Sequence, residues 1–401
     1  MKQGLKENWK QFSLLVLINA FVGAMIGIER TIFPTLAHER FGLTSVTAGL
    51  SFIVSFGIAK AITNYFSGIL STKIGRKNTL LLGWVLALPI PILFLTANSW
   101  EIIVLTNILL GIHQGLAWSS TVVMKMDLVG VANRGLALGL NEFAGYISVA
   151  ILAYFSTVWV AEYGIDFPFY VGIVIAVTGL LLSLFTVETS QLSIQETVTL
   201  SEKISELPIW KNKNLRTVIA SGFVNNLNDG MVWGLLPIIL IIKGLSITQI
   251  GTITSIYPAV WGISQLFTGK LSDIFCKKDL MSLGMFMQGI ALLLFFPNNP
   301  IYYFVIGSIL IGIGTAVVYP TFMASIAENT NPTTRPKILG IFRMFRDSGY
   351  AFGALISGIL VDNFGLLAPI IFISLITIIS GVSIKIEMYC LTIKQKRLKI
   401  A

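Results

Sequence analysis

The sequence is poor in charged residues, in cysteine and in catalytic motifs. Asp, Glu, Lys and Arg make up only 12% of its 401 residues, whereas a soluble domain has roughly 25%. Cys276 and Cys390 are too few for a disulfide framework, and no CxxC or Cys/His cluster indicates a metal site. The GxxxxGK[ST], Gly-x-Ser-x-Gly and HExxH motifs are also missing, so we expect no enzyme activity and no cofactor.

Long apolar runs are abundant instead. Hydrophobic residues make up 55% of the chain, and its mean hydropathy is +0.81. Because about 20 apolar residues cross the hydrocarbon of a bilayer as a helix, the sequence predicts an all-α, multi-pass membrane protein with twelve transmembrane helices. The predicted spans are 12–36, 46–70, 79–97, 101–124, 136–160, 168–187, 215–240, 248–270, 280–297, 301–324, 338–361 and 366–386.

The positions of the cations predict the orientation of these spans. With both termini in the cytoplasm, 22 of the 28 Lys and Arg residues, Lys125 among them, fall in cytoplasmic segments. Only Arg40 and Lys243 fall outside. This bias is typical of proteins of the cytoplasmic (inner) membrane. It also accounts for the net charge of +9 without a nucleic-acid partner.

The spans divide into two similar halves. The polar stretch 188–214 predicts a cytoplasmic linker between a six-helix half at 1–187 and another at 215–401. The segment SGILSTKIGRKNTLLLG (67–83) aligns with TGKLSDIFCKKDLMSLG (268–284) at an offset of 201 residues. The same offset pairs Gly111 with Gly312 and Asp127 with Glu328. Tandem halves of this kind are one recurrent transporter architecture.

These segments resemble the GxLaDrxGrk loop of the major facilitator superfamily, and the resemblance extends over essentially the whole chain. Thr72 replaces the acid of the first copy, and Cys276 replaces the glycine of the second. The resemblance implies two pseudo-symmetric halves around a central cavity that is lined by helices 1, 4, 7 and 10 and completed by helices 2, 5, 8 and 11. The chain is similar to bacterial drug/proton antiporters, although GLALGLNEFAGY (135–146) lacks their GP-rich signature.

The repeated loops also predict a conformational latch at the cytoplasmic face. Their glycines allow tight turns, and an acid there can meet the positive N-terminus of a neighbouring helix. The alternative is that these charges only set the topology. The predicted latch residues are Gly68, Lys73, Gly75, Arg76, Asp127, Arg134, Gly269, Asp273, Glu328 and Arg335.

Ionisable residues inside the spans are candidate functional groups, because a charge at the centre of a membrane helix costs about 2.5–3.5 kcal/mol. The stretch FVGAMIGIERTIFP (21–34) places Glu29 beside Arg30, with Pro34 permitting a bend and the pair Gly23 and Gly27 permitting close packing. The candidates for proton coupling are Glu29, Asp229 and Glu142. The residues expected in the substrate cavity are Arg30, Lys60, Asn64, His113, Trp118, Asn225, Trp233, Tyr257, Gln265, Tyr319, Arg343, Arg346 and Asp347.

Several of these residues have a structural alternative. Glu29 is either a proton carrier or an ion-pair partner, and Glu142 is a gate or a partner of Arg134 or Arg346. His113 titrates or makes a structural hydrogen bond. Arg343 and Arg346 bind an anionic substrate or neutralise Glu142 and Asp347.

The sequence therefore predicts a secondary transporter that moves a small solute by alternating access. Family analogy favours a monomeric, proton-coupled exporter whose partners are the lipid bilayer, the solute and protons. Uptake of a small organic anion, as a symporter or antiporter, is the alternative, and a solute sensor without transport is a third possibility. Four cations and four acids within the spans do not decide the charge of the solute.

Overall fold

The computed structural model describes residues 3–130, 134–192, 209–330 and 334–390, with the side chains of Arg134, Lys270, Ser272, Asp273 and Pro336 left undescribed. Every regular element in these ranges is a helix. The first six predicted spans become α1 (Trp9–Arg30) with α2 (Phe33–Glu39), α3 (Val46–Gly49) with α4 (Ser51–Ile74), α5 (Arg76–Ala87) with α6 (Pro89–Thr96), α7 (Trp100–Val129), α8 (Arg134–Tyr163) and α9 (Phe167–Leu184).

The remaining six predicted spans correspond to one helix each. They are α11 (Lys213–Ile242), α12 (Ile247–Ile274), α13 (Lys277–Leu293), α14 (Ile301–Glu328), α15 (Arg335–Phe364) and α16 (Leu367–Glu387). Within the described ranges, nine helical segments are long and apolar enough to span a membrane; α12, α13 and α15 lie outside that set. The predicted linker falls partly outside the described residues, at 193–208, so the proposed division into halves stays a prediction.

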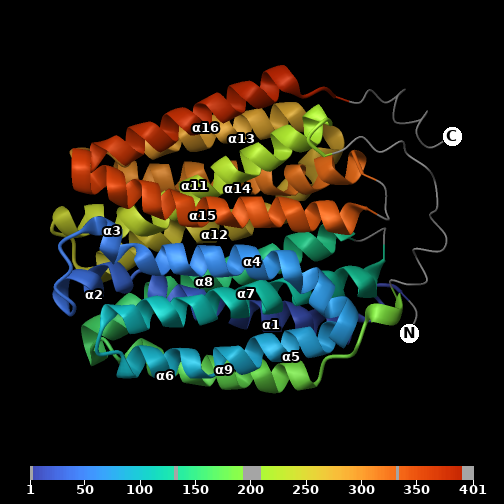
Figure 1. Ribbon diagram of the computed structural model, residues 1–401, viewed down its shortest axis with the longest axis horizontal. Coiled ribbons are helices and arrows are strands. Elements are labelled where there is room, and N and C mark those ends of the chain that lie inside the picture. Colours follow the sequence, from blue (N-terminus) through green and yellow to red (C-terminus); the bar gives the residue numbers. More distant parts are fainter. Residues whose placement is uncertain (1–2, 131–133, 193–208, 331–333, 391–401) are drawn as a thin grey trace.

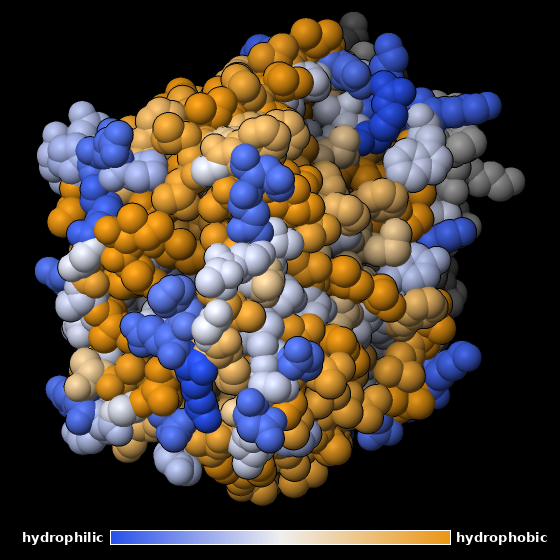
Figure 2. Space-filling view, turned by 60° about the vertical axis from the view of Figure 1, so that its left-hand side comes forward, coloured by the Kyte–Doolittle hydropathy of each residue, from blue (hydrophilic) through white to orange (hydrophobic). Residues whose placement is uncertain are grey.

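The long helices lie roughly side by side in one bundle, with the start of α1 and the end of α16 at the same end of it (Figure 1). We refer to this as the terminal end; α2 and α3 lie at the opposite end. Large apolar side chains such as Phe66, Val174 and Phe267 are exposed on the flanks. Figure 2 shows hydrophobic side chains over much of the flank and hydrophilic ones gathered toward the ends. This distribution suits a bundle surrounded by lipid.

The 201-residue repeat reappears in the helix packing. A Cβ added at Gly111 would meet Phe56 and Ala59, and one added at Gly312 would meet Tyr257 and Val260, each 201 residues further on. Likewise, Gly83 approaches Leu116 and Ala117, whereas Gly284 approaches Val317 and Val318. The two copies therefore use equivalent glycines to bring equivalent helices together, and the sequence repeat is confirmed as a structural one.

The first helix packs as its sequence predicts, but it breaks inside the predicted span 12–36, where only a bend was expected. A Cβ at Gly23 would lie 2.1 Å from the Gly145 carbonyl oxygen, and one at Gly27 would lie 2.6 Å from that of Val149. The GxxxG pair therefore brings α1 against α8. Helix α1 ends at Arg30, directly after the charged pair, and α2 restarts at Phe33 with Pro34 in its first turn. Pro has no N–H to continue the α1 ladder, which explains the break.

The opposite end of the bundle is closed by contacts between distant parts of the chain. Asp362 of α15 accepts hydrogen bonds from Ser45 Oγ (2.7 Å) and from the backbone N–H groups of Val46 (2.8 Å) and Thr47 (3.0 Å). A Cβ at Gly358 would lie 2.6 Å from the Thr47 Cα. These contacts hold α15 against α3.

Three glycines near the terminal end are unobstructed. A Cβ added at Gly68, Gly135 or Gly340 would meet no described heavy atom within 4 Å. These glycines lie near the terminal ends of α4, α8 and α15, in contrast to the tightly packed Gly358 at the opposite end of α15. Loop glycines at the opposite end, such as Gly42 and Gly365, are likewise unobstructed, so the closure there rests on the contacts between α15 and α3.

The two cysteines, 114 residues apart, meet at the terminal end. Cys276 precedes α13, Cys390 follows α16, and a disulfide joins them with a Cα–Cα distance of 5.9 Å. The carboxylate of Asp279 lies nearby, so that the three potential ligand atoms are within 4.8 Å of one another. The count of two cysteines excluded a framework of several bridges, but it gave no sign of this single link.

Candidate functional site

A charged cavity lies between the helices, nearer the terminal end. It encloses about 360 Å³ of space not occupied by atoms, part of which is open to solvent. The first half of the chain contributes Lys60, Asn64, Trp118, Ser119, Glu142 and Tyr146, from α4, α7 and α8. The second half contributes Tyr319, Arg343, Arg346 and Asp347, from α14 and α15. Seven of the residues that the sequence analysis expected in the cavity, and the coupling candidate Glu142, therefore lie together.

Both acids of the cavity are held by protein donors. Glu142 Oε1 accepts hydrogen bonds from Trp118 Nε1 (3.0 Å) and from Asn141 Nδ2 (3.1 Å). Asp347 accepts from the side-chain amides of Asn64 and Asn226. Its Oδ1 also lies 3.3 Å from Arg346 Nη1. Neither carboxylate therefore depends on a ligand for a hydrogen-bond partner.

The three bases of the cavity differ in their surroundings. Arg346 pairs with Asp347 and also stacks on the Tyr319 ring, 4.4 Å from its centroid. The Lys60 ammonium lies 5.6 Å from the Phe56 ring centroid and 5.8 Å from that of Trp118. The only hydrogen bond that Arg343 makes within the described residues goes to Ser119 Oγ, at 3.4 Å. Arg346 is thus neutralised locally, whereas Lys60 and Arg343 are not.

The internal repeat relates residues across this cavity. Trp118 corresponds to Tyr319, and Glu142 corresponds to Arg343, each at the offset of 201. Equivalent positions on α8 and α15 therefore present opposite charges to the same space. The repeat supplies similar frames, and the side chains make the two walls electrostatically different.

Asp229 lies deeper between the helices, on α11. It is 2% exposed, and its Oδ1 accepts a hydrogen bond from the hydroxyl of Tyr257 on α12. Tyr257 Oη is also 3.5 Å from Thr315 Oγ1. The Tyr257 ring stacks on Trp261, which stacks on the cavity residue Tyr146 with centroids 3.6 Å apart. A column of aromatic rings thus connects this carboxylate to the cavity wall.

Glu29 and Arg30 point in different directions, as adjacent helical residues do. Arg30 is 1% exposed and lies between the rings of Phe56 (4.4 Å) and Tyr350 (5.1 Å). Glu29 lies beside Asn107 of α7. The two charges approach to 3.9 Å, Arg30 Nε to Glu29 Oε1. Neither side chain lines the cavity, although one of them was expected to do so.

Other candidates lie outside the cavity lining. His113 is buried between α5 and α7, where Nδ1 is 2.9 Å from the Gly83 carbonyl oxygen and the ring packs on Trp84. Asn225 accepts a hydrogen bond from Gln288 of α13. Trp233 packs near Tyr257, with ring centroids 6.0 Å apart, and Gln265 is 3% exposed on α12. Their helices were expected to line the cavity, but His113, Asn225 and Trp233 contact neighbouring helices, and Gln265 is buried outside the lining.

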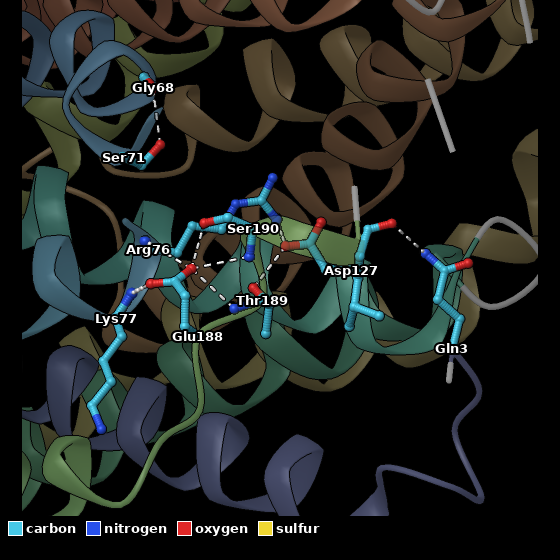
Figure 3. Close-up of polar contacts among 10 residues, drawn as sticks. Gln3, Gly68, Ser71, Arg76, Lys77, Asp127, Glu188, Thr189 and Ser190 are labelled. Carbon is cyan, nitrogen blue, oxygen red and sulfur yellow. Dashed lines mark hydrogen bonds and ion pairs between the residues drawn. The ribbon is translucent and has the colours of Figure 1, made fainter. Parts of the chain in front are cut away.

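The first predicted latch loop forms a compact network (Figure 3). Arg76 forms an ion pair with Asp127, whose Oδ2 also accepts from Thr189 Oγ1 at 2.8 Å. Glu188, just beyond α9, accepts from the backbone N–H groups of Arg76 and Lys77, both at 3.1 Å. Its carboxylate thus caps the positive N-terminus of α5.

Gly75 makes this cap possible. It has φ +88° between α4 and α5, and a Cβ there would lie 2.5 Å from Glu188 Oε2. Of the other residues expected in this latch, Gly68 lies beside open space and Lys73 is exposed. The side chain of Arg134 lies outside the described residues.

The second loop repeats the ion pair at the same offset. Lys277 Nζ is 2.6 Å from Glu328 Oε1, as Arg76 pairs with Asp127. Arg335 donates to the carbonyl oxygens of Ala327 and Thr330 at the end of α14. The side chain of Asp273, which follows Gly269 in this loop, lies outside the described residues. Each ion pair stays within its own half in this conformation, so latching between the halves stays a prediction.

The sequence analysis missed several buried polar residues. Lys125 was placed in a cytoplasmic segment, but α7 continues to Val129, and Lys125 is fully buried with Nζ 3.2 Å from the Leu15 carbonyl oxygen. Asn19 donates to the Asn141 carbonyl oxygen at 2.7 Å. Only the segment GLNEF, which holds Asn141 next to Glu142, hinted at this network.

Comparison with known proteins gives a consistent result. A family model described as "Major Facilitator Superfamily" matches residues 14–219 and 218–396. The "Proton-coupled antiporter flippase LtaA" of Staphylococcus haemolyticus is 22% identical over 374 residues, which cover 90% of this chain and 89% of that protein. "Multidrug resistance protein 2" of Bacillus subtilis is 26% identical over 176 residues, 44% of each chain. The crystal structure of the human organic anion transporter MFSD10 (TETRAN) shares the fold, with a TM-score of 0.71, 14% identity and coverage of 94% and 99%.

Proposed function

Because the chain belongs to the Major Facilitator Superfamily, we propose that it is a proton-coupled antiporter that exports a small solute. It is a multi-pass membrane transporter and not an enzyme. The names of two relatives, a proton-coupled antiporter flippase and a multidrug resistance protein, support coupling to protons and export. The solute, the coupling ion and the direction are the parts that we propose for this chain.

The observation that carries the proposal is the asymmetric access to the cavity. The cavity lies nearer the terminal end and is partly open to solvent, whereas Gly358 and Asp362 hold α15 against α3 at the opposite end. A carrier that alternates between two such states exposes one site to each side of the membrane in turn. The terminal-open state would load a solute from the side on which the chain ends lie.

We place that side in the cytoplasm of a bacterial cell, with the protein in the inner membrane. The support is the distribution of Lys and Arg, which strongly favours the loops at the terminal end. With this orientation the cavity loads from the cytoplasm, and release on the other side is export.

Asp229 is the proposed principal proton carrier. It is buried, it lacks an ion-pair partner within the described residues, and its hydrogen bond comes from a neutral phenol, Tyr257. A carboxylate in such surroundings can be neutral or charged without breaking an ion pair. Glu29 is the second candidate, but its neighbour Arg30 favours an ion-pair role. Glu142, with its two fixed donors, suits a gating role better.

The test is solute-driven proton movement in liposomes. The purified protein would be reconstituted with a pH-sensitive dye inside and exposed to a panel of small solutes. We expect proton flux that depends on a solute, that is abolished by Asp229→Asn and that is retained by Glu162→Gln, an exposed acid at the opposite end of α8. Solute movement without any proton flux, unchanged in both Asp229→Asn and Glu29→Gln, would overturn proton coupling through these residues.

A further inference from the structure

The cavity holds more positive charge than its own acids neutralise. Its titratable lining consists of three bases, Lys60, Arg343 and Arg346, against two acids, Glu142 and Asp347. Tyr146 and Tyr319, which complete the polar wall, are neutral at physiological pH. A solute that enters this space therefore meets a net positive wall.

The acids are also unavailable to a cationic solute. Asp347 is 2% exposed and accepts hydrogen bonds from Asn64, Asn226 and Arg346. Glu142 is 3% exposed and holds two donors of its own. A cation would have to displace these donors and leave buried polar groups unpaired, which is unfavourable.

Two of the bases are available to an anion. Lys60 and Arg343 are partly exposed, and neither has a carboxylate within ion-pair distance among the described residues. Lys60 contacts ring faces, and Arg343 makes one long hydrogen bond to a hydroxyl. Arginine offers a planar pair of donors that suits a carboxylate or phosphate.

The two cations also face the cavity from different halves of the chain. Lys60 is on α4 and Arg343 is on α15, and these helices pack closely where Gly57 meets Ala351. Trp118 and Tyr146, with ring centroids 5.3 Å apart, form an aromatic wall of the same space. An anionic group and an aromatic or apolar body can therefore be accommodated together.

We infer that the transported solute is an organic anion whose carboxylate or phosphate binds between Lys60 of α4 and Arg343 of α15. This inference rests on the proposed transport function and adds the class of solute. An anion that bridges the two cations offsets their mutual repulsion and draws the two halves together, so that binding favours closure of the terminal end. Without it, two like charges oppose that closure.

The binding test uses probes that share one ring and differ in charge. Benzoate and phenyl phosphate are the anionic probes, with benzyl alcohol as the neutral match and benzylamine as the cationic one. Binding would be followed through the fluorescence of the tryptophans, since Trp118 lines the cavity. We expect saturable binding of one or both anions, which also distinguishes carboxylate from phosphate. Binding of benzylamine alone, or equal binding of the neutral probe, would overturn the inference.

The variants are Lys60→Met and Arg343→Gln, each expected to weaken anion binding at least tenfold. Arg343→Lys retains a cation and should recover part of the affinity, which shows that a loss in Arg343→Gln is not a folding defect. Arg40→Gln, an exposed cation at the opposite end, is the matched control. Anion affinity that is unchanged in both neutral variants, with thermal stability equal to wild type, would contradict the site.

Measurements of anion efflux and proton flux distinguish this inference from the proposed function. Exchange of one monoanion out for one proton in carries two elementary charges inward, so an inside-negative potential set with potassium and valinomycin should accelerate efflux of the anion. Anion efflux without proton flux would support the anion site and overturn proton coupling. Proton-coupled efflux of benzylamine, with no efflux of either anion, would support proton coupling and overturn the anion site.

Discussion

The carboxylate of Asp362, on α15, accepts a hydrogen bond from Ser45 Oγ at 2.7 Å. Residues 317 positions apart in the chain are thereby joined at the end of the bundle away from the termini. The same carboxylate caps the N-terminus of the short helix α3 through two backbone N–H groups. One substitution at Asp362 removes all three of these hydrogen bonds.

Asp362→Ala should therefore open the opposite end more often. The contact is exposed, so its loss should shift the balance by about 1–2 kcal/mol, roughly tenfold in the open population. A cysteine at Thr254, which is buried 3.4 Å from Thr31 across the closure, would report it in a Cys276→Ser/Cys390→Ser background. We expect faster labelling by a membrane-impermeant maleimide. Asp166→Ala, an exposed acid at the same end, is the control, and equal rates in the two variants would argue against the role of Asp362.

Gly358→Leu should have a larger effect on the same equilibrium. A Cβ at this position would be 2.6 Å from the Thr47 Cα, so α15 and α3 must separate to admit a side chain. Overpacking of this kind costs about 1–3 kcal/mol. Labelling of the same Thr254→Cys reporter should rise, whereas Gly135→Leu, at an unobstructed position, should leave it unchanged. A Gly358→Leu variant that labels as slowly as its parent would show that the closure adapts to the added volume.

Glu188 should make the terminal end sensitive to acid. Burial raises the pKa of its carboxyl, but hydrogen bonds from Ser190 and from the backbone amides of Lys77 and Arg76 outweigh burial and hold the pKa below its usual value. A lowered pKa in the folded state stabilises the fold at neutral pH, and this contribution is lost as the pH falls through the folded value. The thermal stability of Glu188→Gln should therefore be lower than that of wild type at neutral pH, with the gap closing in acid. A gap that is constant with pH would mean that the charge of Glu188 plays no part.

The cysteine pair predicts an intramolecular cross-link. Cys276 and Cys390 meet within one chain, so mild oxidation of the purified protein should remove both thiols from reaction with a maleimide without forming covalent dimers. Reduction should restore both thiols. If the terminal end lies in the cytoplasm, as proposed above, the reduced pair is the state expected in the cell. Cys276→Ser is the control, because it leaves Cys390 without this partner. Dimers of the oxidised wild type, or a thiol that stays reactive, would contradict the placement of the C-terminal segment.

Helix positions could be predicted closely because each apolar run is bounded by turn residues or charges. The repeat at an offset of 201 was also visible in the sequence. Gly83 and Gly284 allow the same close helix packing in each half, and each loop holds an equivalent ion pair. Helix ends were less accurate. The predicted fourth span stopped at residue 124, because Lys125 resembles a boundary in sequence, whereas its long side chain reaches the Leu15 carbonyl oxygen inside the bundle.

The direction of individual side chains was harder to predict. A membrane helix has apolar residues toward lipid and toward its neighbours, so the hydrophobic pattern does not reveal its rotation. Lys60 and Arg343 line the cavity, as ionised side chains that avoid lipid can do, and their role there stays a prediction. Asn225 and His113 instead meet Gln288 and the Gly83 carbonyl oxygen on neighbouring helices. A neutral polar side chain can form its hydrogen bonds either in the cavity or with a neighbouring helix. Only the assembled bundle shows which of the two it does.

The position of Arg30 between Phe56 and Tyr350 has a consequence for how the protein is made. Synthesis proceeds from the N-terminus, so α1 reaches the bilayer long before α15 exists to supply Tyr350. Until then the guanidinium has one aromatic partner and the nearby carboxylate of Glu29. The nascent N-terminal half should therefore be an incompletely assembled intermediate, vulnerable to quality-control proteases, and its maturation should wait for the last quarter of the chain to be inserted.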